Sequence, residues 1–421
     1  MVAYINRDNY LQKLINRRDN GEIKIITGSR RTGKSWLLKK IYRDYLLRQG
    51  VNESNIISIS FDIDEDVEGQ DLSNPLILKK FLYSKITNEE ENYYVFLDEI
   101  QMVEGFERIV NGLNAHDNVD VYITGSNSKF LSTDINTIFR GRGDEIRVYP
   151  LSFKEFCSGR TEPFNELWKE YYTYGGMPAL RNRSTPEQKA SYLQHLWQKT
   201  YIDDVVERNA VKNRNALECL VDQLCSSIGS LTNPHKISNT LQSVQHVTIG
   251  DETISQYMQY LENAFLFEGA RRYNVKGRKY YESLKKYYVV DVGLRNARLN
   301  FRQQELPHIM ENVIYNELRT RDYLVDVGVV ESRKMQNGES IYSQYEIDFI
   351  ATNGIDKYYI QSAYALPTDE KREQEITSLK KVDNSFCKIV IVSDDIATYT
   401  DDNGFVFMGL FQFLKNKNIL E

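Results

Sequence analysis

The strongest pattern in the sequence is the run GSRRTGKS at residues 28–35, which has the spacing G-x-x-x-x-G-K-[S/T]. A β-rich run at 22–27 precedes it, and a helical pattern at 36–42 follows it. Gly28 and Gly33 allow the backbone to curl so that its amides face phosphate oxygens, and the following helix terminus adds partial positive charge. The sequence therefore predicts a phosphate-binding loop between a strand and a helix.

The last two residues of this run have expected roles at a bound nucleotide. Lys34 is expected to bridge the β- and γ-phosphates, and the Ser35 hydroxyl is expected to hold Mg²⁺. ATP and Mg²⁺ are thus the predicted cofactors. The predicted cofactor-binding residues are Gly28, Ser29, Arg30, Arg31, Thr32, Gly33, Lys34, Ser35 and Asp98, of which Ser35 and Asp98 would face the metal.

Two carboxylates end a second apolar run at residues 92–99. A continuous apolar run is typical of a buried parallel strand. Asp98 would orient Mg²⁺ through water, and Glu99 would act as the general base on the attacking water. This pair indicates an ATPase that hydrolyses ATP rather than a kinase, although an isolated Asp-Glu pair also occurs in ordinary strand-end turns.

Further catalytic candidates follow a third predicted strand at 119–125. Asn127 and Ser126 are placed to contact the γ-phosphate or its water, with a simple Asx or Ser turn as the alternative. Arg142, and after it Arg140, is a candidate arginine finger, acting in cis or on a neighbouring subunit. Solvated surface arginines remain the competing interpretation.

These stretches together resemble prokaryotic AAA-type ATPases that carry a C-terminal domain of uncharacterised function. The resemblance implies ATP as the ligand and leaves the purpose open, and it singles out Arg142, the arginine of the Gly-Arg pair. The matching stretches are 25–35, 96–101, 123–128, 141–142, 149–156, 174–178, 291–294, 311–318 and 346–349.

Length and composition set the frame for the remaining chain. With 421 residues and 41% hydrophobic residues, the sequence predicts several folded cores rather than disorder. No apolar run reaches the length of a membrane span, and the start lacks the build of a signal peptide, so a cytoplasmic protein without membrane contact is expected. The four cysteines and five histidines show no metal-site spacing. The expected domains are an ATPase domain at 1–150, a helical lid or linker at 151–214, a winged-helix-like domain at 215–300 and a nuclease-like domain at 301–421.

The segment 215–300 combines short helices with a basic β-hairpin, which is the outline of a winged helix. The net charge of −6 gives no overall attraction to nucleic acid, so any contact requires a local patch. Such a patch could bind phosphates or stack on bases, and a face for protein contacts is the alternative. We call it the basic wing, and it contains Arg271, Arg272, Lys276, Arg278, Lys279, Lys285 and Lys286, interleaved with Tyr273, Tyr280 and Tyr281.

The order of elements in 301–421 is similar to the PD-(D/E)XK nuclease fold. Asp348 and Gln361 are the candidate metal ligands, and Glu311 or Glu317 would complete the set from a helix. Such nucleases also need a lysine that neutralises developing charge, and Ala363 occupies its position here. The departure predicts a fold kept for binding, without cleavage.

The fold class expected from these patterns is a multidomain α/β protein. It begins with an AAA- or RecA-like parallel sheet and continues with a helical and winged-helix region and an α/β nuclease-like domain. The function expected is Mg²⁺-dependent ATP hydrolysis coupled to a recognition module for DNA or a protein partner, with oligomers allowed. Two alternatives remain: a slow nucleotide-gated binding switch and an ATP-dependent nuclease.

Overall fold

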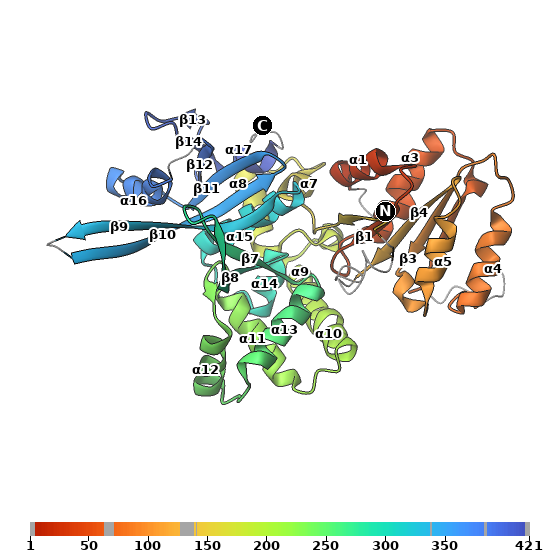
Figure 1. Cartoon of the computed structure of the whole chain (residues 1–421), viewed down its shortest axis with the longest axis horizontal. Helices are drawn as coiled ribbons and strands as arrows, with labels where there is room; N and C mark the ends of the chain where they lie inside the picture. The colour runs from red at the N-terminus through yellow and green to blue at the C-terminus, as the bar shows by residue number, and fades with distance from the viewer. Residues whose placement is uncertain are drawn as a thin grey trace. The chain divides into compact units, whose positions relative to one another are not determined.

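The computed structural model describes residues 5–62, 71–126, 139, 141–336, 339–382 and 385–416. Contacts divide the chain into two compact units (Figure 1). The first contains 1–150 with 263–265, and the second contains 151–262 with 266–421. A finer division of the second unit at residues 214 and 300 stays a prediction.

The first unit is built on a five-stranded sheet in the order β2-β3-β4-β1-β5, in which every neighbouring pair is parallel. Three of its strands are buried along their whole length, as continuous apolar runs require. The predicted α/β class with an N-terminal parallel sheet is therefore confirmed. The strands are β1 (Ile23–Thr27), β2 (Ile56–Ser60), β3 (Tyr93–Asp98), β4 (Val119–Gly125) and β5 (Gly143–Arg147).

Helices cover both faces of this sheet and bury a separate apolar cluster on each (Figure 1). One cluster lies under α4 and α5, and the other lies under α1 and the helix that follows the phosphate loop. The helices are α1 (Asp8–Arg17), α2 (Lys34–Trp36), the π-helical segment η1 (Leu37–Tyr42), α3 (Arg43–Arg48), α4 (Pro75–Lys85) and α5 (Phe106–Leu113).

The parallel arrangement brings the carboxyl ends of the central strands to one edge. β1 ends at Thr27, β3 ends at Asp98, and β4 ends at Gly125, with Thr27 paired to Gly125. The loops that follow these strands therefore meet at that edge, which is where open α/β sheets bind their ligands.

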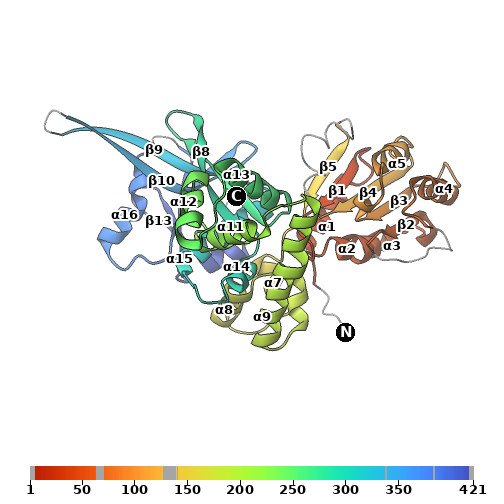
Figure 2. The same cartoon turned by 90° about the horizontal axis from the view of Figure 1, so that it is seen from below.

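The second unit contains a nine-stranded mixed sheet in the order β13-β14-β12-β11-β10-β9-β7-β8-β6. The hairpin formed by β9 and β10 extends away from the rest of this unit in both views (Figures 1 and 2). The strands are β6 (Leu231–Thr232), β7 (Phe267–Asn274), β8 (Lys279–Val289), β9 (Leu324–Gln336), β10 (Glu339–Asn353), β11 (Asp356–Ala363), β12 (Cys387–Val392), β13 (Tyr399–Thr400) and β14 (Val406–Gly409).

Helices of the second unit precede, interrupt and follow this sheet. In the segment from α11 to β8, the order is helix, short strand, two helices and a hairpin, and β8 pairs with both β6 and β7. Among the helices that the structure describes, none has the length and apolar composition needed to cross a membrane. The helices are α7 (Phe153–Cys157), α8 (Phe164–Tyr174), α9 (Pro186–His195), η6 (Leu196–Ile202), α10 (Asp203–Arg208), α11 (Arg214–Ser226), α12 (Pro234–Gln245), α13 (Asp251–Asn263), α14 (Val292–Arg298), α15 (Leu306–Thr320), α16 (Asp369–Lys380) and α17 (Leu410–Lys415).

The glycine-containing stretches 174–178 and 291–294 lie far apart in the sequence and pack against each other where α8 meets α14 (Figure 2). The buried Asp291 caps α14 by accepting from the Leu294 amide at 3.0 Å, and it also accepts from the Gly176 amide at 2.7 Å. A Cβ at Gly293 would stand 1.8 Å from the carbonyl oxygen of Tyr174, so only glycine allows this approach. These motifs therefore have a packing role.

The Asp291 contact makes stability depend on pH with a defined sign. Burial raises the pKa of the Asp291 carboxyl to about 6, although backbone amides oppose the shift. Its stabilising contribution is therefore complete below the unfolded pKa of about 4 and is lost as the pH rises through 6. We expect the free energy of unfolding, measured as wild type minus Asp291→Asn, to fall by about 2 kcal/mol between pH 4 and pH 7. A difference that is flat across this range would contradict the assignment, and urea titration measures it.

Candidate nucleotide site

The phosphate loop leaves the carboxyl end of β1 and enters the helix that starts at Lys34. Gly28 has a φ of 138°, and a Cβ there would lie 2.2 Å from the carbonyl oxygen of Val148. Gly33 also has a positive φ, at 96°. The Thr32 hydroxyl donates to the Ser29 carbonyl at 2.9 Å and closes the loop on itself. Glycine is thus required at Gly28 by both conformation and space.

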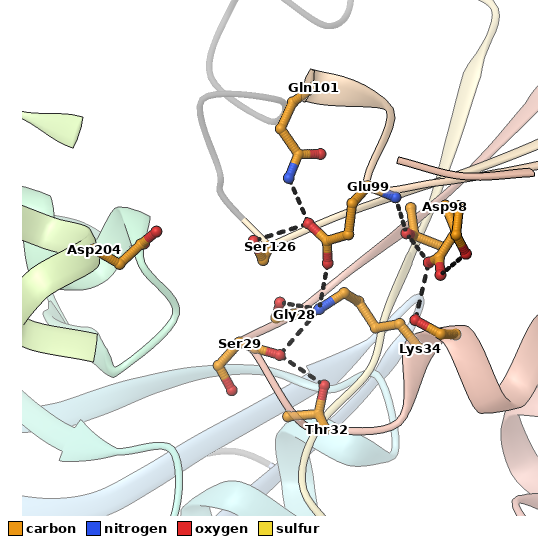
Figure 3. A network of polar contacts seen from close by, with 12 residues as sticks. Gly28, Ser29, Thr32, Lys34, Asp98, Glu99, Gln101, Ser126 and Asp204 are labelled. Carbon is orange, nitrogen blue, oxygen red and sulfur yellow. Dashed lines mark hydrogen bonds and ion pairs between the residues drawn. The ribbon is translucent and has the colours of Figure 1, made fainter. Parts of the chain in front are cut away.

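The Lys34 ammonium lies at the centre of the loop and is buried (Figure 3). It donates to the carbonyl oxygens of Gly28 at 2.9 Å and Ser29 at 3.0 Å, and it stands 3.7 Å from Glu99 Oε1. Burial lowers the pKa of Lys34, while the charges of Glu99 and Asp98 oppose that shift. The loop therefore holds a cation in the position where an anionic ligand would enter.

Asp98 ends β3 directly beside the start of the loop helix. Its Oδ1 accepts from the Ser35 hydroxyl at 3.0 Å and from the Thr124 hydroxyl at 2.6 Å. Its Oδ2 accepts from the Ser60 hydroxyl at 3.3 Å and lies 3.1 Å from Lys39 Nζ. Hydroxyls from three different segments thus fix the orientation of this carboxylate.

Glu99 follows in a left-handed backbone conformation with φ 53°, which turns its side chain toward the loop. Its Oε2 accepts from the Ser126 hydroxyl at 3.1 Å and from the Gln101 amide (Figure 3). Its backbone amide donates to Thr124 Oγ1 at 2.9 Å. A strained position held by several hydrogen bonds is characteristic of a functional carboxylate.

These residues fit ATP with Mg²⁺. The glycine cradle would be filled by a Cβ, and the buried Ser29 hydroxyl has no hydrogen-bond partner among the described residues. The Ser35 hydroxyl and the Asp98 carboxylate supply the hard oxygen atoms that Mg²⁺ prefers. The predicted Lys34, Ser35, Asp98 and Glu99 therefore lie together as one site.

Of the other predicted catalytic residues, the structure describes Arg142, and it does not bring Arg142 into this site. Arg142 is exposed just before β5, and its carbonyl oxygen accepts from the Ile23 amide at the start of β1. The loop lies at the other end of β1, and five strand residues span about 16 Å. Asn127 and Arg140 lie outside the described residues.

Four residues of the site were missed by sequence reasoning. Thr124 and Gln101 bind the two acidic residues, as do Ser60 and Lys39. Lys39 was detectable, because it lies four residues after Ser35 and therefore on the same helical face. Ser60 was not detectable, since only the pairing of β2 with β3 brings it to Asp98.

A second polar cluster lies in the other unit, around the carboxylates predicted as a vestigial nuclease site. Lys286 Nζ stands 3.0 Å from Glu311, 2.7 Å from Glu346 and 3.6 Å from Asp348. Burial and the charge of Glu311 raise the pKa of Asp348 to about 7. A lysine from β8 therefore occupies this cluster, although the sequence pattern placed the missing lysine at Ala363.

The two other side chains predicted as ligands at that cluster, Gln361 and Glu317, have different surroundings. Gln361 Oε1 is buried and accepts no hydrogen bond from the described residues, and Glu317 pairs with Arg321 at 2.8 Å. Across the described ranges, no three His, Cys, Asp or Glu side chains are arranged to hold a metal ion. A vestigial site formed by Glu311, Asp348 and Gln361 stays a prediction.

The basic wing needs a correction, because four of its seven residues have partners within the unit. Arg271 lies 4.0 Å from Asp326, and Arg272 donates to Gln344 at 3.4 Å. Lys286 is buried in the carboxylate cluster and is not a surface residue. Lys285 stands 3.5 Å from Glu262. The residues Lys276, Arg278 and Lys279 remain exposed around the turn between β7 and β8. Charge pattern alone could not separate these two groups.

Comparison with known proteins agrees with the site. Residues 20–157 match the family described as an AAA domain, and residues 165–305 match a domain of unknown function. An uncharacterized protein of Haemophilus influenzae is 37% identical over 394 residues, covering 92% of this chain and 93% of that protein. An uncharacterized protein of Methanocaldococcus jannaschii is 29% identical, covering 94% and 86%.

Solved structures match the chain only at low similarity. The Aeropyrum pernix ORC1 protein in complex with DNA has a TM-score of 0.31 at 13% identity, covering 73% of this chain and 94% of that one. AMPPCP-bound DnaA from Aquifex aeolicus has a TM-score of 0.29 at 15% identity, covering 62% and 89%. Because it is 37% identical to the Haemophilus influenzae protein over nearly the whole of both chains, the chain belongs to that protein's family, and its residues 20–157 form an AAA domain.

Proposed function

We propose that this protein binds and hydrolyses ATP with Mg²⁺ and couples the nucleotide state to a recognition module in its second unit. The main supporting observation is a pair of contacts between the phosphate loop and the end of β3. Lys34 faces Glu99, and the Ser35 hydroxyl donates to Asp98. A buried lysine, a metal-facing hydroxyl and a held base are the parts that phosphoryl transfer to water requires.

Each residue then has one task in the reaction. Lys34 turns from the loop carbonyls and neutralises charge that develops on the transferred phosphoryl group. Ser35 and Asp98 would hold Mg²⁺, which would supply stabilisation of the negative charge of the nucleotide phosphates. Glu99 orients a water and accepts its proton, and the Ser126 and Gln101 donors keep that carboxylate in position.

Arg142 can take part only if another copy of the chain is present. It lies near the amino ends of the strands, whereas the loop lies at the carboxyl ends. An arginine finger at this position therefore serves the site of a neighbouring copy, so the proposal includes an oligomer as the hydrolysing form.

The recognition module is proposed to be a winged helix that contacts DNA through its hairpin. The order from α11 to β8 supports this assignment. α13, the helix before the hairpin, contains no lysine or arginine. The exposed residues Lys276, Arg278 and Lys279 would therefore make the contacts with phosphates. Arg271 is also 57% exposed, and its guanidinium stacks 3.9 Å from the Tyr280 ring. A stacked pair of this kind suits contacts with phosphates and bases.

We expect the triple alanine variant of Lys276, Arg278 and Lys279 to bind duplex DNA more weakly than wild type. Each phosphate contact releases about 0.9 counterion, so the slope of log K against log salt should fall by about 2 to 3. Fluorescence anisotropy across a salt series measures this slope. The matched control removes three positive charges on α4, at Lys79, Lys80 and Lys85. Equal slopes for the two triple variants would sink the DNA assignment.

ATP hydrolysis by wild type, with and without single- and double-stranded DNA, tests the coupling. DNA-stimulated hydrolysis supports the nucleic-acid module, whereas steady hydrolysis that ignores DNA points to a protein partner. ATP binding without turnover would instead favour the slow switch.

A further inference from the structure

Lys39 forms an ion pair with the carboxylate that would face the metal. Its Nζ stands 3.1 Å from Asp98 Oδ2, while the Ser35 hydroxyl bonds to Asp98 Oδ1 at 3.0 Å. Lys39 and Ser35 are four residues apart and lie on the same face of the loop helix. One helix face thus presents a hydroxyl and an ammonium to the two oxygens of one carboxylate.

The contrast in burial shows which partner is able to move. Asp98 is 2% exposed and receives hydrogen bonds from Ser35, Thr124 and Ser60, so its position is fixed. Lys39 is 28% exposed and carries its charge on a flexible four-carbon stem. The ammonium is therefore free to exchange between the carboxylate and solvent without disturbing the rest of the site.

The backbone around Lys39 is also unusual. Residues Leu37–Tyr42 form a π-helical segment between α2 and α3. π-helical turns are rare and occur frequently at functional sites. This widened turn includes Lys39, and it follows directly on the residues that would hold the nucleotide.

We propose that Lys39 is a built-in competitor of Mg²⁺: its ammonium neutralises Asp98 in the metal-free site and must leave when the metal–nucleotide complex binds. The inference rests on the proposed nucleotide site. In the metal-free state, the pairs Lys34–Glu99 and Lys39–Asp98 balance all four charges. An entering Mg²⁺ meets a like charge at Asp98, so part of its binding free energy is used to displace Lys39.

Equilibrium binding of a fluorescent ATP analogue tests this without reference to turnover. The dissociation constant of the analogue from the full chain is measured in EDTA and in excess Mg²⁺. The value in EDTA divided by the value in Mg²⁺ gives the coupling between metal and nucleotide. The affinity of the free nucleotide for Mg²⁺ is the same for every variant, so it cancels when the ratios of two variants are compared. We expect Lys39→Met to increase this ratio about three- to tenfold, the range of a half-buried ion pair.

Two further variants separate this effect from a general loss of charge. Lys40 is the next residue of the same helical segment and is exposed. Lys40→Met therefore also removes one positive charge and should leave the ratio at the wild-type value. Lys39→Arg retains the cation and should stay near wild type. Thermal unfolding of each variant identifies any loss of folding.

The outcomes separate the inference from the proposed function. A ratio in Lys39→Met that equals that of Lys40→Met, or falls below wild type, overturns the competition. Wild type that binds the analogue in neither condition, while remaining folded, overturns the nucleotide site itself.

Discussion

Replacing Glu99 with glutamine is expected to lower the rate of ATP hydrolysis about a thousandfold while ATP binding persists. Glutamine keeps the shape of the side chain and its contacts with Ser126 and Gln101, but it cannot accept a proton from water. The phosphate loop and Lys34 are unchanged in this variant, so ground-state binding should survive. Phosphate release under steady-state conditions, together with equilibrium ATP binding, measures both effects.

The matched control is Glu104→Gln, which makes the same change at an exposed position outside the strand end. It should hydrolyse ATP at the wild-type rate. Hydrolysis in Glu99→Gln within a few-fold of wild type would remove Glu99 from the role of general base.

Replacing Lys286 with methionine is expected to destabilise the second unit by about 3 to 5 kcal/mol. Lys286 is 5% exposed and lies against Glu311, Glu346 and Asp348, so its loss leaves buried carboxylates without their cation. Glu346 is 36% exposed and is screened by water more than Glu311 and Asp348, which are 12% and 11% exposed. Chemical denaturation monitored by tyrosine fluorescence and circular dichroism measures the change.

Lys285→Met is the control for this prediction, because Lys285 is the preceding residue of β8 and its side chain is 41% exposed in its contact with Glu262, against 5% for Lys286. It should cost less than about 1 kcal/mol. Adding Asp348→Asn to Lys286→Met should recover part of the lost stability, since one uncompensated charge is then removed. Equal destabilisation by the two lysine substitutions would show that the cluster contributes little.

The residues of the candidate nucleotide site were largely predictable, because they are contiguous in the sequence or end an apolar strand. The loop at 28–35 carries its own backbone requirements, and parallel pairing of β1, β3 and β4 then brings Asp98 and Glu99 to it. The local sequence pattern and the sheet topology both predict that the loop, Asp98 and Glu99 lie together.

The second unit was less predictable, because its decisive contacts join distant segments. Lys286 belongs to a basic run, and only the fold shows that it points into a cluster drawn from α15 and β10. Asp291 and Gly176 are 115 residues apart and meet through one hydrogen bond. Charge and spacing along the chain contain no signal for such pairs.

Calorimetric titration of the wild-type chain with ATP in the presence of Mg²⁺ tests the central claim most directly. We predict saturable binding at one site per chain, which Lys34→Ala reduces at least tenfold because the buried ammonium that faces the phosphates is lost. Undiminished binding by folded Lys34→Ala, or no binding by wild type, would contradict the assignment of residues 28–35 as the nucleotide site.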